Sequence, residues 1–148
     1  MFRSDILFYW DIATQQLMNS DGTTSSVPTP TIMLFNEYIF KIQVYSSYPT
    51  VADLTDLFVW KNGIGIVGGV TDPPLVETLD VDINTDPWAD KSLGKISVLV
   101  NTHGIDLITD VGLSEQKQYK NEIKADNGTN IITVMLAPIM CKNTVYRA

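Results

Sequence analysis

The sequence predicts an all-β domain, an antiparallel β-sandwich of Greek-key or jelly-roll-like type with little helix. Three observations support this prediction. Apolar and polar residues alternate with a period of two in several segments, clusters of Gly, Pro, Asn and Asp separate those segments, and apolar stripes at helical spacing are weak. Strands that bury one face against a second sheet show this alternation.

The chain has the length of a single domain. A protein of 148 residues can bury roughly two-thirds of its unfolded surface, enough for an independent core. The stretch 20–30 is rich in Ser, Thr and Pro and is the most linker-like part of the sequence. Two divisions stay open: an N-terminal strand or arm with a mobile loop at 1–28 before a β-sandwich domain at 29–148, or one domain over 1–148.

The expected strands follow the alternation. Segment 1–11 is predicted to be the first strand and not a signal peptide, because its apolar stretch is short and lies between Asp5 and Asp11. In Glu37–Tyr45 the alternation is interrupted only at Ile39. The other predicted strands are Leu75–Asn84, Ile96–Asn101, Ile105–Val111, Tyr119–Ala125 and Ile131–Leu136.

Two short sequences predict hairpin turns, because Asn and Gly accept the positive φ that such turns require. The first is Asn62-Gly63, which would join strands at 57–61 and 64–67. The second is Asp126-Asn127-Gly128, which would join the last two predicted strands.

Composition argues against several classes of partner. Seventeen acidic and ten basic residues give a net charge of −7, which disfavours nucleic acid because phosphates need clustered Lys and Arg. No apolar run approaches the roughly 20 residues of a membrane span, so membrane insertion is not expected. The single cysteine allows no intrachain disulfide, so the chain is expected to mature in a reducing cytosol.

Two motifs resemble ligand sites but fit strands better. The run 63–68 spells G-x-G-x-x-G, yet the following residues, Gly69–Pro74, cannot start the helix that a dinucleotide needs, so we interpret it as a glycine-rich strand. The acidic run 80–86 resembles a calcium loop but has Thr85 and Lys91 where Gly and Glu are required. We interpret it as the solvent face of a strand. The alternative is a weak cation site at Asn84, Asp86 and Asp90.

Catalytic residues, cofactors and metal ligands are not predicted. The only histidine, His103, lies in a predicted loop, and Cys141 lies in an apolar run where inert cysteines are usual. An enzyme would require a Cys–His or carboxylate pair that meets only in the fold. Trp60 lies in a predicted strand and is expected in the core, and for the other surface-capable aromatics core or loop-anchoring roles are the alternative to sugar stacking. Tyr48, beside Pro49, and Trp88, in a turn, are the candidate surface-contact residues.

The stretch Thr29–Val44 resembles the opening of small β-sandwich domains in bacteriophage tail-fibre and baseplate proteins, where a short apolar segment and a polar turn lead into a long alternating strand. Gly94–Asn101, Tyr119–Ala125 and Ile131–Val134, with the turn at 126–128, resemble their closing hairpin. The resemblance spans about residues 29–145.

This resemblance implies a non-enzymatic virion structural protein, associated with the tail, baseplate or fibre and made in the host cytoplasm without a signal peptide. Its partners would be other virion proteins and copies of itself, as a homotrimer or higher ring, and a host-surface glycan is a further candidate. The alternative is a carbohydrate-binding or lectin-like β-sandwich module, in which turn aromatics stack on sugar rings.

Overall fold

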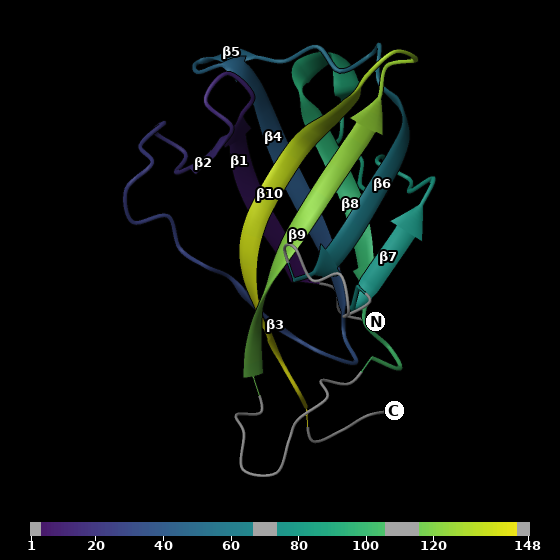
Figure 1. Ribbon diagram of the computed structural model, residues 1–148. Coiled ribbons are helices and arrows are strands. Elements are labelled where there is room, and N and C mark those ends of the chain that lie inside the picture. The colour runs from purple at the N-terminus through teal and green to yellow at the C-terminus, as the bar shows by residue number, and fades with distance from the viewer. Residues whose placement is uncertain (1–3, 67–73, 106–115, 145–148) are drawn as a thin grey trace.

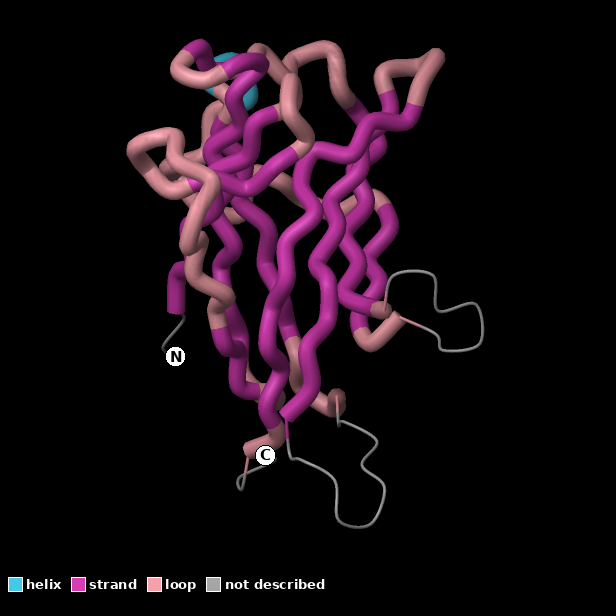
Figure 2. The backbone as a smooth tube through the Cα atoms, turned by 60° about the vertical axis from the view of Figure 1, so that its left-hand side comes forward, coloured by secondary structure: helices cyan, strands magenta, loops and turns pink. Residues whose placement is uncertain are grey.

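Two five-stranded β-sheets pack face to face in the computed structural model (Figure 1). The structure describes residues 4–66, 74–105 and 116–144. The strands of both sheets follow the long axis of the molecule (Figure 2), and the predicted all-β sandwich class is confirmed. Within these ranges there is no helix long and apolar enough to cross a membrane.

Sheet A is built around β4 (Glu37–Ser47). On one side of β4 lies β1 (Ser4–Asp11), which is parallel to it, and on the other lies β8 (Lys95–Asn101), which is antiparallel. Two short strands complete the sheet. β2 (Gln16–Met18) pairs with the C-terminal end of β1, and β5 (Thr50–Val51) folds back on the C-terminal end of β4.

Sheet B has the strand order β3-β10-β9-β6-β7. β3 is parallel to β10, and the other neighbours are antiparallel. The bounds are β3 (Thr31–Met33), β6 (Phe58–Gly65), β7 (Val76–Leu79), β9 (Gln116–Asp126) and β10 (Ile131–Lys142).

The sandwich is therefore mostly, but not wholly, antiparallel, which corrects the sequence prediction in one respect. The pairs β1–β4 and β3–β10 are parallel. Parallel neighbours require a crossover connection. Here the chain passes from β1 and β2 in sheet A to β3 in sheet B before it returns as β4. Period-two alternation is the same for both strand directions, so it could not distinguish them.

The core lies between the two sheets and includes β1. Phe8 and Trp10 of β1 are buried, and the Phe8 ring meets the Phe40 ring edge-on with centroids 5.4 Å apart. Such aromatic pairs contribute about 0.5–1.5 kcal/mol beyond the burial of their area. Trp60 is buried in the same cluster, as the sequence predicted.

Two predicted boundaries are wrong. Asn62-Gly63 is not a turn but lies inside β6, one continuous strand whose pairing is irregular only between Phe58 and Trp60. The predicted strand Leu75–Asn84 ends at Leu79, where Asp80 adopts a φ of 51° and turns the chain. The acids that follow are thus not a strand face, although Ile83 is still buried.

The final hairpin is confirmed. Asp126-Asn127-Gly128 connects β9 to β10, with Gly128 at a φ of 92° and its N–H donating to Asp126 Oδ1 at 2.6 Å. The predicted strand Ile105–Val111 falls almost entirely outside the described residues, and Ile105 itself is not in a strand.

The segment between β7 and β8 runs beside sheet A and closes the edge of β8. The Ser97 N–H donates to the Ile83 carbonyl at 2.7 Å, and the Val44 N–H donates to the Gly94 carbonyl at 2.7 Å. Gly94 has a φ of 71°, and a Cβ there would overlap the Val44 carbonyl oxygen. Ile39, the residue out of phase, points to the outer face of β4 and is nevertheless buried.

Candidate functional site

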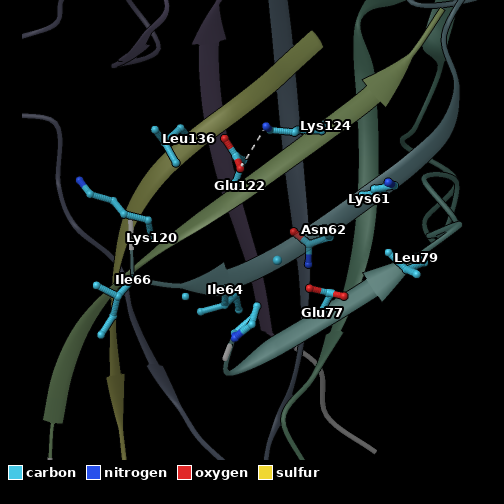
Figure 3. Close-up of a pocket in the computed structure, with 13 residues that line it drawn as sticks. Lys61, Asn62, Ile64, Ile66, Glu77, Leu79, Lys120, Glu122, Lys124 and Leu136 are labelled. Atoms are coloured by element: carbon cyan, nitrogen blue, oxygen red, sulfur yellow. Dashed lines mark ion pairs between the residues drawn. The ribbon is translucent and has the colours of Figure 1, made fainter. Parts of the chain in front are cut away.

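The outer face of sheet B contains a groove of about 480 Å³ along β6, between β7 and β9 (Figure 3). We call it the glycine groove because Gly63 and Gly65 form its floor. Gly63 pairs with Glu77 on one side and Glu122 on the other, and Gly65 pairs with Lys120. Since glycine has no side chain, the flanking residues become walls. The first two glycines of the G-x-G-x-x-G run therefore lie in a strand, which agrees with the predicted glycine-rich strand except that Gly63 is not in the expected turn before it. Gly68 lies outside the described residues.

The walls of the glycine groove carry both signs of charge. Lys124 Nζ lies 3.8 Å from Glu122 Oε1, and Lys61 and Lys120 complete a basic rim. Both members of this ion pair are substantially exposed, so their attraction adds at most about 1 kcal/mol to stability. Glu77 and Glu122 were missed from the sequence because they are distant in the chain, and only the pairing of β6 with both neighbours brings them to one row.

Two buried asparagines lie on the inner side of the same strands. Asn62 and Asn121 are diagonal neighbours in the β6–β9 ladder, and both are almost inaccessible to solvent. The Oδ1 atom of each has no hydrogen-bond partner. An unmet buried polar group costs about 1–3 kcal/mol, so these two amides reduce the stability of this part of the core.

A second groove, of about 340 Å³, lies against the edge of sheet A, and we call it the edge slot. One wall is formed by residues 6–9 of β1, the end of β2 borders the slot, and the loop that follows β2 forms the other wall. None of its lining residues is charged, although the chain as a whole has a net charge of −7. The lining residues are Ile6, Leu7, Phe8, Tyr9, Leu17, Met18, Asn19, Ser20, Val27, Pro28 and Pro30.

Large apolar side chains are exposed at the end of sheet B, two of them beside the turn from β9 to β10 and one on the edge strand β7. We call Phe58, Leu79 and Ile131 the apolar end of sheet B; their exposed fractions are 52%, 61% and 64%. Phe58 and Ile131 both pair with Asp126, one on each side of β9. Leu79 pairs with Lys61, so the apolar end adjoins the glycine groove.

Tyr48 and Trp88 are both at the surface. Tyr48 is 38% exposed, and its ring meets that of Tyr45 edge-on at 5.0 Å. Burial, with smaller effects from the Tyr48 and Tyr9 hydroxyls, raises the pKa of Tyr45 above its ordinary value. Trp88 is partly buried in a turn, with the Lys95 and Lys41 ammonium groups 5.4 and 5.8 Å from its ring centroid. Neither residue lines the glycine groove or the edge slot.

The acids of the alternative cation site have other roles. Asp86 Oδ1 accepts the Trp88 N–H at 2.8 Å and lies 3.8 Å from Lys41 Nζ. Asp90 Oδ1 accepts both the N–H and the hydroxyl of Ser92. No group of three or more His, Cys, Asp or Glu residues within the described ranges could hold a metal ion. The weak cation site at Asn84, Asp86 and Asp90, which contains two acids and an amide, stays a prediction.

His103 and Cys141 are in different environments. His103 lies exposed in the turn after β8, whereas Cys141 is fully buried in β10. Burial raises the pKa of the Cys141 thiol from 9.0 to about 12, the opposite of the shift that an activated nucleophile needs. Neither side chain lines either groove.

Comparisons with known proteins identify no family. No family model matches the chain, and no curated protein sequence matches it. Among solved structures, the chain is similar to the N-terminal domain of phage TP901-1 ORF48. The identity is 7%, the alignment covers 95% of this chain and 98% of that one, and the TM-score is 0.40.

Proposed function

We propose that this chain is a non-enzymatic structural protein of a bacteriophage virion, associated with the tail, baseplate or fibre, which acts by protein–protein assembly with copies of itself. The virion setting is suggested by the resemblance of residues 29–145 to phage tail-fibre and baseplate domains. The ORF48 domain is also a phage protein, but a TM-score of 0.40 is too low for a role to be transferred from it.

The main support for self-assembly is the apolar end of sheet B. Phe58 on β6, Leu79 on β7 and Ile131 on β10 each expose more than half of their surface at the same end of sheet B. Clusters of exposed apolar side chains with polar neighbours are typical of protein–protein interfaces. Here Lys61 and Lys124 supply the polar neighbours. A second copy of the chain would cover these side chains in a symmetric oligomer, which is the common state of self-associating proteins.

The experiment is to measure native mass by light scattering over a range of concentrations. The unmodified chain is expected to give a multiple of 16.5 kDa. The double variant Phe58→Lys/Ile131→Lys is expected to be monomeric, because two buried charges would disfavour the contact. The matched control is Leu93→Lys, which changes an exposed leucine in the 3-10 turn Lys91–Leu93 before β8 and should leave the mass unchanged.

Circular dichroism of each variant checks that it remains folded. A mass of 16.5 kDa for the unmodified chain at every concentration would overturn self-assembly. An oligomer that survives the double substitution would show that the contact lies elsewhere on the molecule.

A second candidate function is glycan binding by the surface aromatic residues Tyr48 and Trp88, favoured by the exposed ring of Tyr48. Trp88 offers a spectroscopic readout, because the other two tryptophans, Trp10 and Trp60, are buried. A saccharide that stacks on Trp88 should therefore change the exposed component of tryptophan fluorescence. Loss of this change in Trp88→Ala, with Trp10 and Trp60 intact, would support the site, and an unchanged spectrum across a saccharide panel would count against it.

A further inference from the structure

We infer that the open edge of β1 accepts an extended, uncharged segment of a different polypeptide as an additional strand of sheet A. The inference rests on the proposed role in protein–protein assembly, but it concerns a surface separate from the apolar end of sheet B. It is carried by the direction of the backbone groups of β1, the shape of the edge slot and the chemistry of its lining.

Backbone groups of β1 alternate between two sides. The Ile12 N–H donates to the Tyr45 carbonyl at 2.9 Å, so Ile12 faces β4. Successive residues of a strand point their N–H and C=O groups to opposite edges. The N–H and C=O groups of Ile6 and Phe8 therefore point to β4 as well, while those of Asp5 and Leu7 point away from it.

The outward groups of β1 are paired only at its C-terminal end. β2 covers Tyr9–Asp11, with Tyr9 opposite Met18. Beyond that point, the N–H and C=O groups of Asp5 and Leu7 have no backbone partner among the described residues. Unpaired backbone groups in a row are a template for a further strand.

The edge slot continues the line of β2. The chain leaves this line at Asn19, where a turn is closed by the Asn19 N–H donating to the Thr23 carbonyl at 2.8 Å. The Asn19 side-chain amide also donates to the Ser25 carbonyl at 3.0 Å. The loop then runs down the side of the molecule to β3 (Figure 1), and Val27 and Pro28 form the outer wall of the slot.

A slot with walls on both sides admits a single extended chain more readily than a folded domain. Its position beside unpaired backbone groups is the geometry of strand addition, in which main-chain hydrogen bonds supply affinity and side-chain pockets supply specificity. We therefore assign the slot to one strand of a partner.

The slot favours uncharged residues in the partner. None of its lining residues carries a charge, and the side chain of Leu7 is 44% exposed there. The nearest acid on β1, Asp5, is held by Lys41 at 2.9 Å. Burying an unpaired charge in such a site would be costly. The expected occupant has small or apolar residues at alternate positions.

The test uses the full chain and a blocked peptide of alternating Thr and Val as the probe. Amide hydrogen exchange is followed residue by residue by NMR, with and without peptide. Peptide is expected to slow exchange at Asp5 and Leu7 by tenfold or more, and to leave Ile6 and Phe8 unchanged because their amides already bond to β4. This alternation distinguishes strand addition from general stabilisation.

Two variants complete the test. Leu7→Pro removes the outward N–H and should abolish the protection of Asp5, whereas Leu7→Ala keeps the N–H and should only weaken binding. Equal protection of odd and even residues, protection that persists in Leu7→Pro, or no protection at saturating peptide would overturn the inference. Protection that appears without peptide and grows with protein concentration would show that a second copy fills the slot, and would also overturn it.

Light scattering of the same samples reports the proposed function separately. If oligomers form but the alternating protection is absent, self-assembly is supported and the proposed strand addition at the edge slot is overturned. If the chain is monomeric but peptide gives the alternating protection, strand addition at the edge slot is supported and self-assembly is overturned.

Discussion

β1 and β10 occupy equivalent places in their sheets but have different edges. Among the described residues, the outer edge of each of these long strands is covered only at the C-terminal end, by a strand of three residues: β2 covers Tyr9–Asp11, and β3 covers Met140–Lys142. The uncovered part of β10 contains Pro138 and a pairing irregularity between Thr133 and Met135. The uncovered part of β1 contains neither.

Pro138 is placed where it protects the β10 edge. The Met140 N–H donates to the Pro30 carbonyl at 2.9 Å, so Met140 faces β3. By alternation, the backbone nitrogen of Pro138 points to the same side of β10 as that of Met140, away from β9. This part of the side is open, so the missing N–H of Pro138 removes no hydrogen bond between β9 and β10. Proline and bulges at such positions discourage the pairing of edges between molecules. The β10 edge therefore has two features that discourage added strands, and the described edge of β1 has neither of them.

The largest expected effect on stability comes from removing the buried ring of Phe8 on β1. Phe8→Ala should lower the free energy of unfolding by about 3–5 kcal/mol, because a buried aromatic ring is lost from the core. Leu7→Ala, the next residue but exposed, should change it by about 0.5 kcal/mol or less. Denaturant titration of both variants measures the contrast. A small loss for Phe8→Ala would mean that β1 is a dispensable arm, and that the slot lacks a firm strand behind it.

The covered end of β10 can be tested through Cys141, which pairs with Ile32 of β3. The folded thiol has a pKa of about 12 against 9.0 for a free one, so between those values the folded state binds more protons and stability falls as pH rises. Between pH 9 and 10.5 this thiol should account for about 1–2 kcal/mol of the loss.

Urea titrations across this range, compared with Cys141→Val, isolate the effect, because the valine variant lacks the thiol but keeps the other titrating groups. Alkylation at pH 8 should be slow in the native chain and fast in denaturant. Rapid native labelling would show that the β3–β10 end opens readily and that this edge is less closed than the pairing indicates.

The smallest effects on stability should come from adding a proline to the open edge of β1 or removing the proline from the edge of β10. Leu7→Pro and Pro138→Ala should each change the free energy of unfolding by about 1 kcal/mol or less, because neither alters a paired N–H. Pro138→Ala restores an outward N–H on β10, and light scattering should then detect added association. Ile6→Pro is the matched control: its N–H faces β4, so its loss of stability should be clearly larger. A comparable loss for Leu7→Pro would mean that the N–H of Leu7 does not face the open edge.

Much of the architecture was predictable because alternation reports which residues face a core. Glu37–Tyr45, the N-terminal strand and the hairpin at Asp126-Asn127-Gly128 follow from local pattern and turn chemistry. Asn62-Gly63 misled for a physical reason. Asn and Gly permit a turn but do not require one, and the pairing of β6 with both β7 and β9 stabilises an extended chain there.

The candidate sites were less predictable because they depend on neighbours across strands. Gly63 carries no sign in the sequence that Glu77 and Glu122 will flank it, and Leu7 looks like any apolar residue of a strand. Tyr48 and Trp88 were selected by type and turn context. The structure places both at the surface, and their role stays a prediction.

Alternation in the sequence is enough to predict a β-sandwich whose core comes from alternating residues, because the period of side chains along a strand is a local property of the backbone. The three-dimensional arrangement was needed to establish that β1 lies parallel to β4, that β2 ends at Met18, and that the backbone groups of Asp5 and Leu7 have no backbone partner among the described residues. Strand order and edge exposure depend on contacts between residues far apart in the chain, which no local pattern encodes.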